Sequence, residues 1–440
     1  MGCTSSVHLG SEDFHLRYSL GPKLGEGSFG QVRAVQRKET RELRAVKVLR
    51  LWSDESRQVG SADPRLLLAA RHEEKLWKSV GKHEHCVELL EVFCDDKLYY
   101  MVMEKCEASL MDRLEEMPRM SEACVARIFR EMLMGIAHLH GRLLMHRDIK
   151  PANFLFGGES GRVVKLCDFG LAARLRRGTL LGGCFGTAPY MSPEMAGEHG
   201  HSMSTDVWSL GATAYVLLYG DFPYGTVDAS SKAMKVAVIM GEPAPQFTRT
   251  LGMGSPSELA ESFVATLLER NPAKRCTAAQ ALQLPFLCRQ VLAPEGGTPS
   301  RSAAEQKTSE ETSLQPVIRS ARRATTRFEL PANHTVQQRG LDELLQRLQD
   351  KGAFARSFSM PMPTAIDEHI EESPLVVRKD SKSSTHSGVW NSRSAMTSST
   401  QCGTGTRTLS LEALQKVIDL DSTDASSEQA EFAPAPPPLN

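Results

Sequence analysis

The run Gly25-Glu26-Gly27-Ser28-Phe29-Gly30-Gln31-Val32 has the composition of a loop that binds phosphate. Glycine has no side chain, so its backbone N–H groups can approach a phosphate closely. Val35 and the apolar residues near it indicate that the run joins two strands. A flexible turn would also explain the glycines, so the run alone leaves both interpretations open.

A lysine within an apolar strand points to the same chemistry. Ala45-Val46-Lys47-Val48-Leu49 predicts a buried strand, where an unpaired ammonium group is costly. Lys47 therefore needs anionic partners. Asp63-Pro64 has the signature of a helix start, an N-cap residue followed by proline. The predicted helix carries these residues at helical spacing: Leu66, Leu67, Ala70, Glu73 and Trp77.

Further short motifs follow in a fixed order: His146-Arg147-Asp148-Ile149-Lys150-Pro151-Ala152-Asn153, Asp168-Phe169-Gly170, Ser192-Pro193-Glu194 and Asp206-Val207-Trp208. Each motif has many chance matches, but their joint order and spacing match the protein-kinase set. From Tyr18 to Leu287 the chain resembles a eukaryotic-type protein kinase. The resemblance implies an α+β fold of two lobes, a small β-rich N-terminal lobe with one key helix and a larger, mainly helical C-terminal lobe.

The resemblance also implies ATP and Mg²⁺ as cofactors and assigns the catalytic roles. Asp148 would accept or orient the proton of the substrate hydroxyl, and Lys150 would contact the γ-phosphate. Lys150 is typical of serine/threonine kinases. Asn153 and Asp168 would bind Mg²⁺, which prefers hard oxygen ligands. Thr187 would place a hydroxyl against the catalytic aspartate.

For the nucleotide, the resemblance pairs Lys47 with the α- and β-phosphates and with a glutamate of the next helix. Glu73 fits the family's register, and Glu74 is the alternative. Met103 would lie behind the adenine, and the backbone from Glu104 to Cys106 would bond its edge. The implied nucleotide-binding residues are Leu24, Gly25, Glu26, Gly27, Ser28, Phe29, Gly30, Val32, Ala45, Lys47, Met103, Glu104, Cys106 and Asp168.

Other family positions are expected to support this site. Glu194 would pair with Arg275 and brace the activation segment, the stretch from Asp168-Phe169-Gly170 to Ser192-Pro193-Glu194. Asp206, at the start of a predicted helix Thr205–Leu218, would hold the catalytic loop. An apolar column linking the lobes would consist of Trp77, Leu89, His146 and Phe169. Ordinary core packing would explain the column equally well.

Several stretches resemble the calcium/calmodulin-dependent and calcium-dependent kinase group: 98–107, 153–156 and 278–282. No EF-hand calcium loop occurs. The chain departs from that group in three places. Ala152 and the shortened Ala108-Ser109 remove carboxylates that bind substrate arginine. Gly183 replaces the phosphorylatable threonine, and Thr179 is the nearest alternative hydroxyl.

The start of the chain predicts lipid attachment. Met1-Gly2-Cys3-Thr4-Ser5-Ser6 fits N-myristoylation at Gly2, with Cys3 as a candidate for palmitoylation. A chance match in a polar start is the alternative. We expect a lipid-anchored protein at the cytoplasmic face of a membrane, partly cytoplasmic. A net charge of −1 gives no nucleic-acid footprint, and ten cysteines without a Cys-x-x-Cys pair fit a reduced compartment.

The expected division is an acylated segment 1–17, a kinase domain 18–287 and a disordered tail 288–440, rich in Ser, Thr and Pro. Within the tail, 341–348 and 411–418 could form docking helices. The basic segment Arg319–Arg327 could be a solvated linker, a phosphosite or a calmodulin target. We expect a serine/threonine kinase acting on protein substrates, with a nucleotide-binding scaffold that recruits partners through its tail as the alternative.

Overall fold

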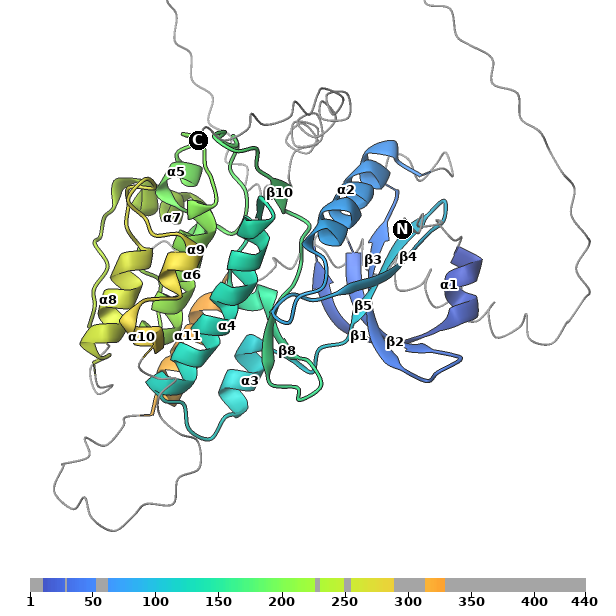
Figure 1. Cartoon of the computed structure of the whole chain (residues 1–440), viewed down its shortest axis with the longest axis horizontal. Coiled ribbons are helices and arrows are strands. Elements are labelled where there is room, and N and C mark those ends of the chain that lie inside the picture. The colour runs from blue at the N-terminus through green and yellow to red at the C-terminus, as the bar shows by residue number, and fades with distance from the viewer. Residues whose placement is uncertain are drawn as a thin grey trace, which may run out of the picture.

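The computed structural model describes residues 11–27, 30–52, 62–225, 230–248, 255–288 and 313–328. They form a small lobe built on a sheet and a larger lobe of helices, side by side in Figure 1. The two-lobed α+β fold predicted from the sequence is confirmed. Gly2 and Cys3, Ser28 and Phe29, and the two predicted tail helices lie outside the described residues.

The small lobe contains a five-stranded antiparallel sheet of order β1-β2-β3-β5-β4. Its strands are β1 (Tyr18–Gly27), β2 (Gly30–Arg37), β3 (Leu43–Arg50), β4 (Leu89–Cys94) and β5 (Leu98–Glu104). The register aligns Gly25, Val32 and Lys47 across the first three strands. Because residues paired across strands point to one face, Val32 and Lys47 present their side chains on the same side of the sheet.

Two helices pack on this lobe. Helix α1 (Ser11–Arg17) precedes the sheet and buries Phe14, whose ring stacks on Tyr100 at a centroid distance of 4.3 Å. Helix α2 (Pro64–Val80) begins as predicted: the side chain of Asp63 accepts a hydrogen bond from the Arg65 N–H, and proline occupies the first turn. Its buried face carries Glu73 toward the sheet.

The larger lobe contains α3 (Leu110–Glu116), α4 (Glu122–Gly141), α5 (Pro193–Ala196), α6 (Ser204–Tyr219), α7 (Ser231–Met240), α8 (Glu258–Leu267), α9 (Ala278–Ala281) and α10 (Pro285–Cys288). Helix α6 is buried from Thr205 to Tyr219, so it forms the centre of the lobe. No helix in the described ranges has both the length and the apolar character that crossing a bilayer requires.

Short elements at the junction of the lobes carry the catalytic motifs. They are β6 (Ala108–Ser109), β7 (Leu144–Met145), η2 (Pro151–Asn153), β8 (Phe154–Gly157), β9 (Val163–Leu166), β10 (Ala173–Arg174) and η3 (Ala188–Tyr190). Strands β6, β8 and β9 form one small sheet, and β7 pairs with β10. The catalytic loop therefore lies between β7 and η2, fixed at both ends.

Within the described residues, the predicted disordered tail contains a helix. Residues Gln315–Thr326 form helix α11, which packs against α3 and α6 (Figure 1, orange). The linker interpretation of the basic segment is therefore wrong for these residues. The physical reason is an apolar stripe at helical spacing, in which Leu314, Val317, Ile318 and Ala321 are each at most 1% exposed.

Candidate functional site

Lys47 is the centre of the site in the small lobe. Its ammonium nitrogen lies 2.6 Å from Oε1 of Glu73 and 2.8 Å from Oδ1 of Asp168. Burial alone would lower the pKa of Lys47, but the carboxylates of Asp168 and Glu73 outweigh it and raise that pKa. Lys47 in turn lowers the pKa of Asp168. The alternative partner, Glu74, instead bonds the Tyr99 hydroxyl and Lys78.

Gly25 and Gly30, on β1 and β2, have different surroundings. A Cβ on Gly30 would lie 2.0 Å from the carbonyl oxygen of Val48, so packing alone demands glycine there. A Cβ on Gly25 would meet no atom of the described residues within 4 Å. Among these residues Gly25 thus borders open space, in the same cross-strand row as Val32 and Lys47. That space next to a cation suits a polyphosphate.

The predicted adenine-binding residues lie farther along the same sheet. Ala45 pairs with Met103 in the β3–β5 register, and both side chains are buried in the main core cluster. Glu104 and Cys106, at the end of β5 and just after it, are only partly buried. Leu24, in β1, is 50% exposed. These residues combine apolar side chains with a partly buried segment after β5, which fits an adenine ring.

The catalytic loop brings the predicted transfer residues together around Asp148. Its Oδ1 accepts hydrogen bonds from the backbone N–H and the hydroxyl of Thr187, at 3.0 and 2.9 Å. Its Oδ2 lies 2.7 Å from the ammonium of Lys150, which also donates to the Thr187 hydroxyl at 2.8 Å. The carboxylate is thereby fixed in orientation from two sides, beside a cation that can reach a phosphate.

The two predicted Mg²⁺ ligands lie next to this cluster. The amide nitrogen of Asn153 donates to the Asp148 carbonyl at 2.7 Å, which fixes the amide group. The N–H of Cys167, the residue before Asp168, bonds the Asn153 carbonyl at 3.0 Å. No group of three or more His, Cys, Asp or Glu side chains suited to a metal occurs in the described parts of the chain. Two oxygen donors fit Mg²⁺ that completes its coordination with nucleotide phosphates and water.

Buried charges hold the loop in place. Asp206, fully buried, accepts hydrogen bonds from the N–H groups of His146 and Arg147, both at 2.9 Å. Arg275 donates to both oxygens of Glu194, at 2.7 and 3.2 Å. Both arrangements match the sequence expectation. Pairs of this kind are good evidence for a fixed arrangement and weak evidence for net stability.

The apolar column also forms. The Phe169 ring lies 5.4 Å from Trp77 and 5.6 Å from His146, measured between centroids. Leu89 packs against the same core cluster. The column connects α2, the catalytic loop and the segment after Asp168.

Sequence reasoning missed Phe185. Its ring lies beneath the guanidinium group of Arg147, which also donates to the Leu171 carbonyl at 2.7 Å. Arg147 and Asp168 both have positive φ, 67° and 62°, a conformation that costs free energy in residues other than glycine. A phenylalanine two residues after Gly183 was the only signal in the sequence.

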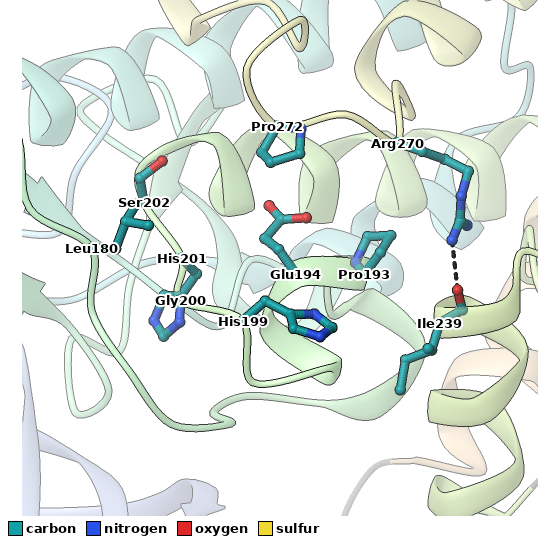
Figure 2. Close-up of a pocket in the computed structure, with 10 residues that line it drawn as sticks. All are labelled: Leu180, Pro193, Glu194, His199, Gly200, His201, Ser202, Ile239, Arg270 and Pro272. Atoms are coloured by element: carbon teal, nitrogen blue, oxygen red, sulfur yellow. Dashed lines mark hydrogen bonds between the residues drawn. The ribbon is translucent and has the colours of Figure 1, made fainter.

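A pocket of about 410 Å³ lies between the activation segment and α7. Figure 2 shows Glu194 at its centre and Arg270 bonded to the carbonyl of Ile239. Neither Lys47 nor Asp148 lines it. It is therefore separate from the candidate active site.

Comparison with known proteins gives the same family. The chain is 31% identical over 280 residues to human serine/threonine-protein kinase H1, covering 62% of this chain and 61% of that protein. It is 30% identical over 287 residues to a probable myosin light chain kinase of Dictyostelium discoideum, covering 64% and 85%. A CDPK-related kinase of Arabidopsis thaliana is 32% identical over 283 residues, covering 63% and 45%.

The match thus spans about three-fifths of the length of the kinase H1 relatives. The sequence model described as "Protein kinase domain" matches residues 18–287, the same range that the motifs delimit. With that match and with the motif residues assembled as above, the chain belongs to the protein kinase domain family.

Proposed function

We propose that this protein is an active serine/threonine protein kinase that transfers the γ-phosphoryl group of Mg-ATP to protein hydroxyls. The observation that carries the proposal is the ion pair of Lys47 with Glu73, together with the Asp148 cluster. Phosphoryl transfer needs the polyphosphate positioned and its charge neutralised, with a hydroxyl aimed at it. The described residues include one candidate for each task.

Bound Mg-ATP would supply the phosphoryl group and a cation that neutralises its charge. Gly25 and its neighbours leave room for the phosphates, and Lys47 carries a positive charge to them. Asn153 and Asp168 offer oxygen atoms to the metal. Asp148 would orient the incoming hydroxyl and take up its proton, while Lys150 neutralises charge on the transferred group.

The test is transfer of labelled γ-phosphate to serine, threonine and tyrosine peptides by the full chain. Asp168→Ala should abolish transfer. Asp96→Ala is the matched control, since Asp96 is an exposed aspartate in the turn between β4 and β5. The proposal is supported if the parent chain and Asp96→Ala label the serine and threonine peptides and Asp168→Ala does not. Tight nucleotide binding without transfer would favour the scaffold alternative.

We also propose that the chain is attached to a membrane through acyl groups on Gly2 and, secondarily, Cys3. One myristoyl chain binds membranes only marginally, with a partition constant of about 10⁴ M⁻¹, so the second chain would make attachment stable. Helix α1 begins at Ser11 and packs on the small lobe. Nine residues span at most roughly 30 Å, so the lipids would keep the small lobe close to the membrane.

A further inference from the structure

The surface between α3 and α6 is covered by α11, the helix that follows the kinase domain. Val317, Ile318 and Ala321 are buried there, each at most 1% exposed. Contact is close enough that a Cβ on Gly220, at the end of α6, would lie 2.9 Å from Cβ of Ser320. The docked helix is thus a fitted part of the lobe.

Polar contacts fix both ends of α11. At its start, the N–H of Leu314 bonds the Met120 carbonyl at 2.8 Å, and the Gln315 amide donates to the Leu114 carbonyl at 3.0 Å. Near its end, Arg322 pairs with Asp112 of α3 at 2.8 Å. Beyond the last turn, the Phe328 ring meets Phe222 edge-on at 5.3 Å.

Two threonines in the last turn have the same sequence context but different exposure. Arg322 stands three residues before Thr325, and Arg323 stands three residues before Thr326. Thr325 is 4% exposed, whereas Thr326 is exposed. Both hydroxyls donate to the Arg322 carbonyl, at 3.0 and 2.8 Å. A kinase that selects arginine three residues before the acceptor would bind it with carboxylates through strong charge-assisted contacts. Both threonines therefore suit such an arginine-directed kinase.

We propose that Thr325 is a phosphorylation site that α11 conceals while docked, and that phosphate on Thr325 keeps the helix off the lobe. The added enzyme is an arginine-directed protein kinase with Mg-ATP. The γ-phosphorus forms a bond to Oγ1 of Thr325 and its bond to the β–γ bridging oxygen breaks. The hydroxyl proton is released, and ADP leaves.

Three physical effects oppose a phosphate at the docked position. A group with a charge of about −1.5 to −2 would be buried at a site that now holds a nearly unexposed hydroxyl. It would lie in the last turn of a helix, where the macrodipole disfavours negative charge. It would also compete with Asp112 for Arg322, its neighbour three residues earlier on the same helix. All three act only on the docked, helical state.

The experiment uses the full chain carrying Asp168→Ala, which removes self-phosphorylation and makes the result independent of the proposed catalytic activity. An arginine-directed kinase and Mg-ATP are added, and mass spectrometry follows Thr325 and Thr326 separately. Ile318→Asp places a carboxylate in the buried face and should undock the helix. Pro316→Asp adds the same carboxylate at an exposed position and is the matched control.

Phosphorylation of Thr325 should be at least tenfold faster in Ile318→Asp than in the parent or in Pro316→Asp. Asp112→Asn, on the other side of the interface, should accelerate it about twofold to fivefold, the scale of one exposed ion pair. If the rates of Thr325 phosphorylation in Ile318→Asp and Pro316→Asp differed by less than threefold, docking of α11 would not conceal the site. Absence of phosphate on Thr325 in Ile318→Asp would overturn the site itself.

The second half of the proposal needs a separate readout. The parent chain is driven to full phosphorylation at Thr325, and hydrogen–deuterium exchange is measured for residues 110–116 and 315–326. Both segments should exchange faster than before phosphorylation. Unchanged exchange in the fully phosphorylated chain would show that the helix still docks.

Discussion

The centroid of the Phe185 ring lies 4.0 Å from the guanidinium carbon of Arg147, so the face of the ring packs against this buried cation. Burial lowers the pKa of Arg147 to about 10, and the Leu171 and Ala172 carbonyls accept its hydrogen bonds. A further backbone pair, between Leu181 and His201, ties the activation segment to the loop before α6. The segment is therefore held by groups that need no phosphate.

We accordingly expect activity without phosphate on the activation segment. Gly183 removes the usual acceptor, and the Thr179 hydroxyl is exposed and bonds the Arg176 carbonyl. Activity of the phosphatase-treated full chain should stay within about twofold of the untreated chain. Mass spectrometry on the same sample would establish that no phosphate remains. A strict requirement for phosphate on Thr179 would contradict this prediction.

Phe185→Ala should reduce kcat, because it uncovers Arg147 and removes a contact worth roughly 1–2 kcal/mol when desolvated. We expect a loss of about fivefold to thirtyfold in kcat with little change in KM for ATP, since the ring contacts Arg147 and His201, which the resemblance does not place at the nucleotide. Phe185→Tyr keeps the aromatic face and serves as the control. Equal activity of Phe185→Ala and Phe185→Tyr would show that the ring is not needed to hold the segment.

Lys47→Met and Asp148→Asn should each lower phosphoryl transfer by at least about a hundredfold, the scale of one lost transition-state contact. Both substitutions change charge and position more than packing. The melting temperature should therefore fall little compared with the loss of activity. Undiminished activity in either variant, prepared free of other kinases, would exclude the role assigned to that residue.

These two residues also show what the sequence could predict. Lys47 and Asp148 lie in local motifs, so the resemblance to protein kinases pointed to them, and the ion pair that the family's helix register implied between Lys47 and Glu73 is present. Phe185 and Arg147 are joined only by the tertiary fold, and no local pattern pairs a phenylalanine with an arginine 38 positions earlier. Their contact required the structure.

Helix α11 could be predicted from the sequence only in part. Its apolar stripe is legible in the sequence, but it consists largely of alanine and β-branched residues among several arginines. An isolated helix of this length is marginal in water, so composition favoured a linker. The surface of α3 and α6 that stabilises it, with Gly220 making room for Ser320, is formed by residues about 100 to 200 positions away.

Acid should destabilise the protein partly through His201. This side chain is 1% exposed, and burial, then the nearby Arg147, lower its pKa to about 4. Between about pH 6.5 and 4 the unfolded chain therefore binds a proton at His201 that the folded chain does not, so stability falls as the pH falls. One such group contributes at most about 3 kcal/mol.

His201→Asn removes that titration. The free energy of unfolding, measured from pH 7.5 to 4.5, should fall more steeply for the parent than for the variant. The comparison of slopes cancels any constant packing loss that the substitution causes. Parallel curves would mean that His201 is protonated in the folded state or does not contribute.

Gly2→Ala should move the protein from the membrane fraction to the soluble fraction, because alanine cannot accept a myristoyl group. Cys3→Ser should weaken attachment only in part, since the myristoyl chain remains. Fractionation of cells expressing each variant gives the result. Full membrane retention of Gly2→Ala would exclude acylation as the anchor.

We expect this chain to differ in substrate choice from the kinase group that it resembles. The resemblance to the calcium/calmodulin-dependent and calcium-dependent kinase group implies that carboxylates which bind an arginine upstream of the acceptor would stand at the positions held here by Ala152 and, approximately, Ser109. A charge-assisted arginine–carboxylate contact is worth roughly 1.5–3 kcal/mol, or about tenfold to a hundredfold in selectivity. The nearest carboxylate on α3, Asp112, accepts a hydrogen bond from the Ser109 hydroxyl at 2.6 Å and pairs with Arg322 of α11.

We therefore expect a weak preference for arginine three residues before the acceptor. The measurement is kcat/KM for two peptides that differ only in arginine or alanine at that position. The ratio should be below about fivefold. A ratio of tenfold or more would contradict the prediction and would mean that another carboxylate, Glu107 or Asp112, binds the arginine. Repeating the pair of assays with Glu107→Gln and with Asp112→Asn would then identify it, because only the responsible residue's variant should bring the ratio back toward one.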